Sequence, residues 1–194
     1  MKGPFFVQSE FLSPLLCEQI IQNDFNDSDS KVVVQRLKGL ISLIESRYNV
    51  TVKDASIPEL EFFGEGNKGE EFHCENSIFV RQKWLRNTSR DLTAIVFLSD
   101  YQDQVPFDND FEVYGGMLEF PQHRSYNDRM MLRFEPQRGT LLIFPSDPHF
   151  INKTTPVKIG DLYRLKFHIT TSEPFLYDPS KFPGTYEDWL KEFL

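Results

Sequence analysis

The chain has 194 residues, of which 40% are hydrophobic, and its aromatic residues include 19 Phe. This length suits one domain over residues 1–194, and the apolar content is sufficient for a sizeable core. The net charge of −8 and the acidic pI argue against general binding to nucleic acids or to anionic membranes. A nucleic-acid substrate at one local basic groove is not excluded.

Cysteine usage and hydropathy indicate the compartment. The two cysteines, Cys17 and Cys74, form neither a Cys-x-x-Cys pair nor a disulfide framework, which favours a reducing environment. The N-terminus lacks the apolar run of a signal peptide, and no stretch approaches the ~20 apolar residues of a membrane span. We therefore expect a cytoplasmic protein that does not associate with membranes.

The N-terminal part, about residues 1–55, has the pattern of helices. Ser13 is a good N-cap residue, and Pro14 suits the first position of a helix. Apolar residues repeat at helical spacing in 31–47 and predict a second helix. The polar segment 23–30 between them predicts a loop.

From Ile57 onward the pattern changes to short apolar or alternating segments separated by turn residues. Many short strands of this kind favour a sandwich or jelly roll over alternating βα units. We expect a β core over about 57–171 and a helical C-terminal tail over 172–194. The predicted strands are 60–63, 78–80, 92–98, 117–120, 132–134, 140–144 and 163–170.

His73 and Glu75 are the first residues that point to chemistry. Side chains at positions i and i+2 of an extended segment lie on the same face, so imidazole and carboxylate come together. One such pair plus a distant histidine is the two-His, one-carboxylate set that binds non-haem Fe(II). The alternative interpretation is an ordinary exposed pair on a strand.

The distant histidine is predicted to be His149. His123 lies in a polar segment and is interpreted as a loop residue, and His168 lies in the last predicted strand as a core residue. His149 instead follows the apolar strand in 139–148, and a strand end can hold a ligand rigidly.

Six features follow one another along about residues 70–170, and together they resemble a known family. They are Phe72–Ser77, Arg90–Asp100, Tyr114–Pro121, Pro136–Pro145, His149 and Pro156–Gly160. This series is similar to the 2-oxoglutarate/Fe(II)-dependent dioxygenases, specifically to the prolyl 4-hydroxylase-like branch and its small microbial or viral members. For a viral protein the expected compartment is the host cytoplasm.

The resemblance implies a fold class, an activity and cofactors. The fold is α+β, a double-stranded β-helix (jelly-roll or cupin-like) of about eight core strands with N-terminal packing helices. His73, Glu75 and His149 are the implied Fe(II) ligands and catalytic centre. The implied reaction uses O2 to hydroxylate a substrate while 2-oxoglutarate is decarboxylated to succinate and CO2, with ascorbate as a supporting reductant.

The first substrate suggested by similarity is a prolyl residue in a peptide, or free proline. Two alternatives remain open. One is a 2-oxoglutarate oxygenase that acts on a nucleobase or on another small metabolite. The other is a jelly roll without catalysis that binds a partner, since this fold also serves binding roles. The sequence leaves the oligomeric state open.

The carboxylate departs from the family pattern, because Glu75 stands where Asp is usual. Glu is one methylene longer, which adds roughly 1.5 Å of reach. Carboxylate oxygen binds the metal in either case, so we interpret Glu75 as a tolerated variant. A small residue here would indicate halogenation, and it is not present.

The cosubstrate residues also depart from the pattern. The family places an Arg or Lys on the strand after the distal His, where a fork of N–H donors binds the far carboxylate of 2-oxoglutarate. Leu162 occupies that position, but Arg164 and Lys166 share its face by alternation. Arg164 is the first choice and Lys166 the second, with Arg90 and Arg81 as rivals.

Two further points bear on the cosubstrate. Phe97 stands where the family often has Tyr, and Thr93 could provide a hydroxyl group one pleat away. The alternative for the last strand is that Arg164 and Lys166 face solvent. In that case the residues between them, Tyr163, Leu165 and Phe167, would form the buried face.

Overall fold

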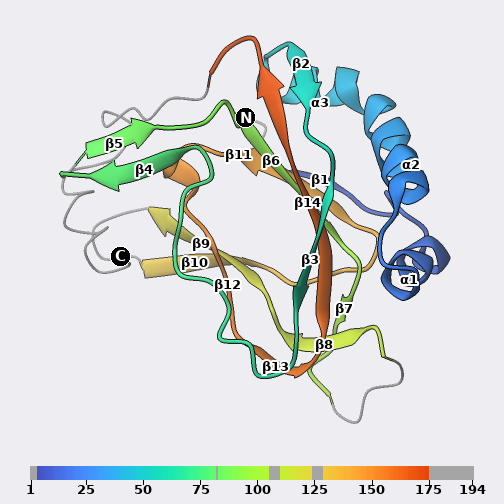
Figure 1. Cartoon of the computed structure of the whole chain (residues 1–194). Coiled ribbons are helices and arrows are strands. Elements are labelled where there is room, and N and C mark those ends of the chain that lie inside the picture. The colour runs from blue at the N-terminus through green and yellow to red at the C-terminus, as the bar shows by residue number, and fades with distance from the viewer. Residues whose placement is uncertain (1–3, 82, 105–109, 124–128, 175–194) are drawn as a thin grey trace.

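The computed structural model describes residues 4–81, 83–104, 110–123 and 129–174 (Figure 1). Its described part is mostly β-sheet, with three α-helices near the N-terminus. None of these helices is long and apolar enough to cross a membrane. The predicted C-terminal helix in the tail lies outside the described residues.

The first helix, α1 (Pro14–Gln22), begins as predicted. The Ser13 hydroxyl accepts a hydrogen bond from the backbone N–H of Leu16 at 3.3 Å, and Pro14 occupies the first turn. Such a cap satisfies an N–H group that has no partner within the helix.

The predicted second helix over 31–47 is wrong in its bounds, because the chain forms two helices, α2 (Asp27–Lys38) and α3 (Ile41–Tyr48). α2 begins inside the predicted loop because Asn26 and Asp29 form a capping box. The break at Gly39–Leu40 separates two stretches that share one apolar periodicity. The apolar periodicity therefore predicts which face of the two helices is buried, but it does not predict the residues at which each helix begins and ends.

Antiparallel pairing builds a six-stranded sheet beside the helices. β14 is its longest strand and pairs with β6 on one side and with both β2 and β3 on the other. The strands are β1 (Phe6–Gln8), β11 (Leu141–Pro145), β6 (Leu92–Phe97), β14 (Leu162–Thr171), β2 (Val52–Ala55) and β3 (Glu59–Phe63).

Three smaller sheets complete the β part. All seven predicted strands overlap observed strands of these sheets or of the six-stranded sheet. The smaller sheets contain β10 (Arg129–Phe134), β9 (Leu118–His123) and β12 (Lys153–Thr154); β13 (Val157–Gly160), β8 (Glu112–Gly115) and β7 (Asp100–Tyr101); and β4 (Ser77–Val80) with β5 (Lys83–Arg86). His123 therefore ends β9 rather than lying in a loop.

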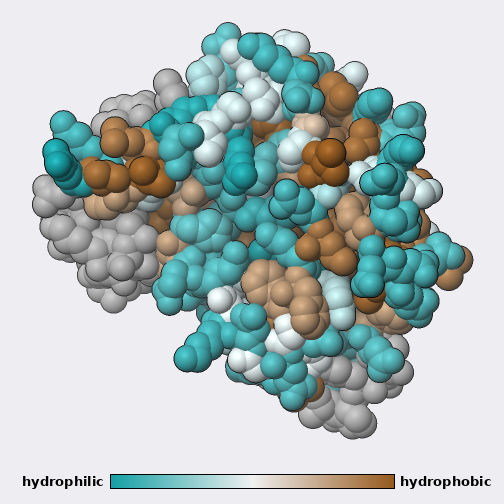
Figure 2. Space-filling view, in the orientation of Figure 1, coloured by the Kyte–Doolittle hydropathy of each residue, from teal (hydrophilic) through white to brown (hydrophobic). Residues whose placement is uncertain are grey.

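The β4–β5 hairpin carries an exposed apolar surface. Ile78, Phe79, Val80 and Leu85 are all more than one third exposed. They form part of the brown surface over this hairpin at the left of Figure 2. The hairpin pairs with no third strand among the described residues.

β6 is buried on both faces and separates two apolar clusters. Ala94 and Val96 face the helices, where Cys17, Ile20, Val33, Leu37 and Ile44 pack against them. Ile95 and Phe97 face the other way and share a second cluster with apolar side chains of β9 and of the neighbouring strand β11. This alternation explains why the strand appears in the sequence as a continuous apolar run.

β14 resolves the alternative that the sequence left open. Leu165 and Phe167 join the helix-side cluster, so Arg164 and the residues two and four positions later point to the other face. Arg164 is 1% exposed, which confirms the inward orientation. A group of polar side chains therefore lies on the face of β14 that points away from the helices, next to the apolar cluster that contains Ile95 and Phe97.

Candidate metal-binding site

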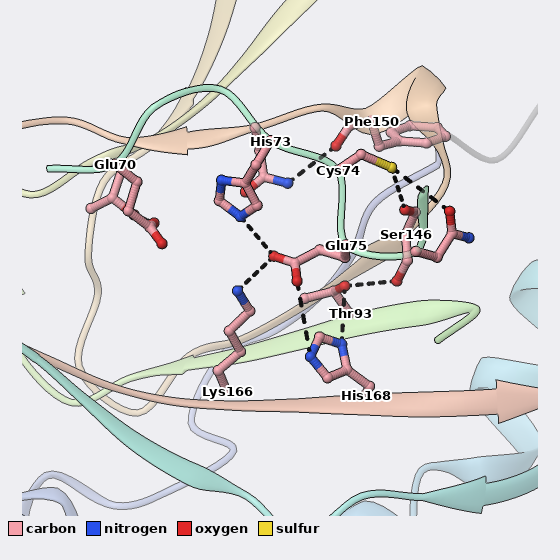
Figure 3. A network of polar contacts seen from close by, with 12 residues as sticks. Glu70, His73, Cys74, Glu75, Thr93, Ser146, Phe150, Lys166 and His168 are labelled. Atoms are coloured by element: carbon pink, nitrogen blue, oxygen red, sulfur yellow. Dashed lines mark hydrogen bonds and ion pairs between the residues drawn. The ribbon is translucent and has the colours of Figure 1, made fainter. Parts of the chain in front are cut away.

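His73 and Glu75 lie just before β4 and meet as the sequence predicts. The imidazole Nε2 of His73 is 3.0 Å from the Glu75 carboxylate Oε1. The Glu75 side chain is 5% exposed and that of His73 is 32% exposed. Figure 3 shows the carboxylate at the centre of a polar network, with His73 above it.

Both ring nitrogens of His73 have acceptor oxygens beside them. Nδ1 is 3.0 Å from the backbone oxygen of Glu71, and a carbonyl oxygen only accepts, so this bond places a proton on Nδ1. Burial alone would lower the pKa of His73, but the hydrogen bond to Glu75 and the charge of that carboxylate outweigh it and raise the pKa above its usual value. In the protonated ring, Nε2–H donates to Glu75.

Lys166, on β14, supplies positive charge to the same carboxylate. Its Nζ lies 2.6 Å from Glu75 Oε1. Burial alone would raise the pKa of Glu75, but the hydrogen bond from His73 and the charge of Lys166 outweigh it and hold the pKa well below its usual range. Glu75 is therefore a carboxylate, the form that binds cations.

His168, two residues further along β14, completes this group. Its Nε2 lies 3.9 Å from Glu75 Oε2, and its Nδ1 lies 3.4 Å from the Thr93 hydroxyl. Thr93 is in turn 2.7 Å from the Ser146 hydroxyl. Burial lowers the pKa of His168 to about 4, so the ring is neutral at pH 7. Sequence reasoning treated His168 as a core residue, although its alternation with Arg164 and Lys166 placed it on the same face.

His149 lies in a short 3-10 helix, η1 (Pro148–Phe150). The Asp147 carboxylate accepts from the backbone N–H of His149 and contacts its Nδ1. The backbone of His73 instead pairs with that of Asn152, whose side chain is buried.

Among the described residues, no three His, Cys, Asp or Glu side chains form a group that could hold a metal ion without rearrangement. The assignment of His149 as the third ligand stays a prediction from the sequence. Asp147 caps η1 and orients His149 locally through its contacts with the backbone N–H and with Nδ1.

Arg164, the first choice for cosubstrate binding, is already engaged. Its guanidinium donates to Glu61 at 2.6 Å, to Thr154 at 2.7 Å and to Glu70 at 3.1 Å. The Thr154 hydroxyl also contacts Glu70. Two internal carboxylates thus occupy the donors that 2-oxoglutarate would need.

A pocket of about 330 Å³ opens beside Lys166 and His168. Its other cationic lining residue is Arg90, so two of the four predicted cosubstrate residues line it and a third, Thr93, contacts His168. The remaining lining residues are polar or acidic: Asp54, Ser56, Glu59, Glu61, Ser89 and Thr170. The pocket gives a small polar molecule access to the network around Glu75.

Comparisons with known proteins give structural likeness only. No family model matches the chain, and no curated protein matches it. A viral collagen prolyl hydroxylase from Paramecium Bursaria Chlorella virus-1, solved as a 2OG complex, superposes with a TM-score of 0.64 at 15% identity. The match covers 88% of this chain and 97% of the viral one.

Two other prolyl hydroxylases are similar. The prolyl-4-hydroxylase of Pseudomonas putida gives a TM-score of 0.59 at 16% identity and covers 86% of this chain and 88% of its own. The prolyl hydroxylase of Trichoplax adhaerens, in complex with a hypoxia inducible factor peptide, gives a TM-score of 0.57 at 14% identity. The match covers 86% of this chain and 83% of the Trichoplax one. The chain has the fold of the prolyl 4-hydroxylases. At these identities the likeness establishes the fold and leaves activity and substrate to be argued from the site.

Proposed function

We propose that the protein is an Fe(II)- and 2-oxoglutarate-dependent dioxygenase built on a double-stranded β-helix. The observation that carries this proposal is the partly buried His73–Glu75 pair in a fold shared with prolyl hydroxylases. The first substrate class is a prolyl residue in a peptide or a proline-like molecule, because the similar structures are named for that reaction. Nucleobases and other small metabolites are the alternative substrates.

The donors around Glu75 suit Fe(II). Imidazole nitrogen and carboxylate oxygen are the ligand types of non-haem iron sites, and two histidines lie within 4 Å of the carboxylate. The Nδ1–H group of His73 donates to the backbone carbonyl oxygen of Glu71, as the second ring nitrogen of a metal-binding histidine usually does. Bound Fe(II), together with 2-oxoglutarate as the reducing cosubstrate and O2 as the oxidant, would supply the oxidation that hydroxylates the substrate.

The residues of the chain provide binding, orientation and charge. His73 and Glu75 would hold the metal from the side of β4. Lys166 and Arg90 line the pocket and can neutralise the two carboxylates of 2-oxoglutarate, whereas Arg164 is already paired with Glu61 and Glu70. Thr93 and Ser146 hold His168 in place through a chain of hydroxyl groups.

One observation favours a second candidate, a binding module without catalysis. The Lys166 ammonium already neutralises Glu75, and this internal ion pair would suit a site that binds no metal. An experiment on cofactor binding separates the two candidates.

Anaerobic addition of Fe(II) and 2-oxoglutarate is expected to produce the weak visible charge-transfer band of their chelate, with uncoupled succinate formation once oxygen is admitted. Glu75→Ala is expected to remove both signals, because it deletes the carboxylate that pairs with both His73 and Lys166. Glu119→Ala, which removes a carboxylate of a different ion-pair group, serves as the control. A wild-type protein with neither the band nor succinate formation would favour the binding module.

Lys166→Met is expected to raise the affinity for Mn(II) about tenfold, since one competing charge next to Glu75 corresponds to roughly 1.4 kcal/mol in a partly buried pair. The matched control is Lys153→Met, which removes a lysine 3.6 Å from a different carboxylate, Glu119. Isothermal titration calorimetry of both variants measures the change. Equal affinities for Lys166→Met and wild type would show that the ammonium does not compete with a metal.

A further inference from the structure

A second pocket, of about 220 Å³, opens on the helix side of the six-stranded sheet. It lies between α2, α3 and β2, which Figure 1 shows side by side. Seven of its ten lining side chains are apolar, and the other three are Lys38, Lys53 and Asp54. We propose that this helix-side pocket binds a small amphiphilic carboxylate, in which a short alkyl chain ends in one carboxylate group. The inference goes beyond the proposed function, because the pocket lies away from Glu75 and its ligand needs no metal.

The floor of the helix-side pocket belongs to the apolar cluster between the helices and the sheet. Leu37, Ile44 and Ile169 line the pocket and are each no more than 4% exposed. Val52 and Ala55 of β2 pack against the same cluster and remain partly exposed. Water in such an apolar pocket finds few hydrogen-bonding partners, so an apolar chain that replaces it gains the free energy of leaving water.

The size of the helix-side pocket selects a small occupant. Pockets for drug-sized ligands usually measure about 300–1,000 Å³, and the volume of about 220 Å³ lies below that range. A stable protein partner instead needs a broad interface, on the order of 1,200 Å² or more. The space therefore suits one short alkyl chain better than a helix or strand of another protein.

Two lysines determine the charge that the pocket accepts. Lys38 is the last residue of α2, Lys53 lies on β2, and both are exposed. Among the described residues, the lysines that form ion pairs are Lys153 and Lys166, so Lys38 and Lys53 have no carboxylate partner there. The chain as a whole carries a net charge of −8, which makes two unpaired lysines beside an apolar pocket a local exception. Their ammonium groups are available to the carboxylate of a ligand.

Asp54 is the acidic side chain among the described lining residues. Its Oδ1 accepts a hydrogen bond from the backbone N–H of Ala55 at 2.8 Å, and Asp54 also lines the polar pocket beside Lys166. Two lysines and one aspartate leave the lining of the helix-side pocket with a net charge of +1. This balance favours a carboxylate over an amine at the end of the alkyl chain.

The test compares three ligands with the same alkyl chain, hexanoate, hexan-1-ol and hexylamine. Each is titrated into the 15N-labelled full chain, and the backbone amide resonances are followed by NMR. We expect hexanoate to bind about threefold or more tightly than hexan-1-ol, because it adds exposed ion pairs with the lysines, and hexylamine to bind most weakly. Octanoate is expected to bind about tenfold more tightly than hexanoate, since each buried methylene contributes about fourfold. The shifted amides are expected in α2, α3 and β2.

Variants separate the contribution of charge from that of the apolar space. Lys38→Gln combined with Lys53→Gln is expected to weaken hexanoate about three- to tenfold and to leave hexan-1-ol within about twofold of wild type. Lys31→Gln, on α2 but outside the pocket, is the matched control for charge. Val34→Phe places a larger side chain in the pocket and is expected to abolish binding of both ligands. Val32→Phe, at an exposed position of the same helix, is the control for size.

Three outcomes would overturn the inference. One is equal binding of hexanoate, hexan-1-ol and hexylamine by wild-type protein. Another is the absence of amide shifts in α2, α3 and β2 at tens of millimolar hexanoate. The third is a dimer, seen by analytical ultracentrifugation, that Val34→Phe disrupts while hexanoate causes no shift, because a second copy would then occupy the pocket. All these measurements use protein without added metal, so their failure leaves the proposed function intact.

Discussion

Replacing Arg164 with methionine is expected to lower the free energy of unfolding by about 3–5 kcal/mol, because it removes a buried cation and leaves two partly buried carboxylates without their partner. The Arg164 side chain is 1% exposed, and its guanidinium donates to Glu61, Glu70 and Thr154. The guanidinium carbon Cζ of Arg164 also lies 4.8 Å from the centre of the Phe63 ring. Urea unfolding followed by circular dichroism measures the loss.

The matched control for Arg164 is Arg133→Met. Arg133 forms an ion pair of the same kind with Glu119 at 2.6 Å, but its side chain is 57% exposed, and Lys153 remains beside Glu119. A loss below about 1 kcal/mol is expected, as for other exposed pairs. Equal losses for the two variants would contradict the view that burial makes the Arg164 network important for stability.

Phe144→Ala is expected to lower the free energy of unfolding by about 3–5 kcal/mol through the cavity that it leaves. Phe144 lies on β11 and is fully buried. Its ring meets the Phe120 ring edge-on, with centroids 4.8 Å apart, so the substitution separates β11 from β9. Because β11 leads directly to Ser146, we also expect weaker metal binding in this variant.

Phe62→Ala is the control for the aromatic core. Phe62 is 55% exposed, and its ring lies 4.9 Å from that of Tyr163. A loss of about 1 kcal/mol or less is expected, because little apolar area leaves water at this position. If Phe62→Ala lowered the free energy of unfolding as much as Phe144→Ala, burial of Phe144 between β9 and β11 would not explain the larger effect expected for Phe144.

The β strands could be predicted from the sequence because most of them are buried on at least one face. β6 and β11 appear as apolar runs, and β14 appears as an alternating one. Short edge strands such as β2 were missed, since Val52–Ala55 bury little surface and depend on pairing with β14. The break between α2 and α3 was missed because both helices pack one apolar stripe on the same sheet.

The candidate site was partly predictable for a similar reason. His73 and Glu75 are two residues apart on an extended segment, so local geometry alone brings them together. His168 is distant in the sequence, and its approach to Glu75 depends on the pairing of β14 with β6, which no local pattern reveals. The turn at η1 likewise depends on the Asp147 cap.

The most direct measurement for the central claim is a crystal structure of the protein soaked anaerobically with Mn(II) and 2-oxoglutarate. The account predicts an anomalous peak within about 2.3 Å of His73 Nε2 and of a Glu75 carboxylate oxygen, with the Lys166 ammonium withdrawn from Glu75. A Glu75–Lys166 ion pair that persists with no peak beside it would contradict the claim that this carboxylate binds a metal.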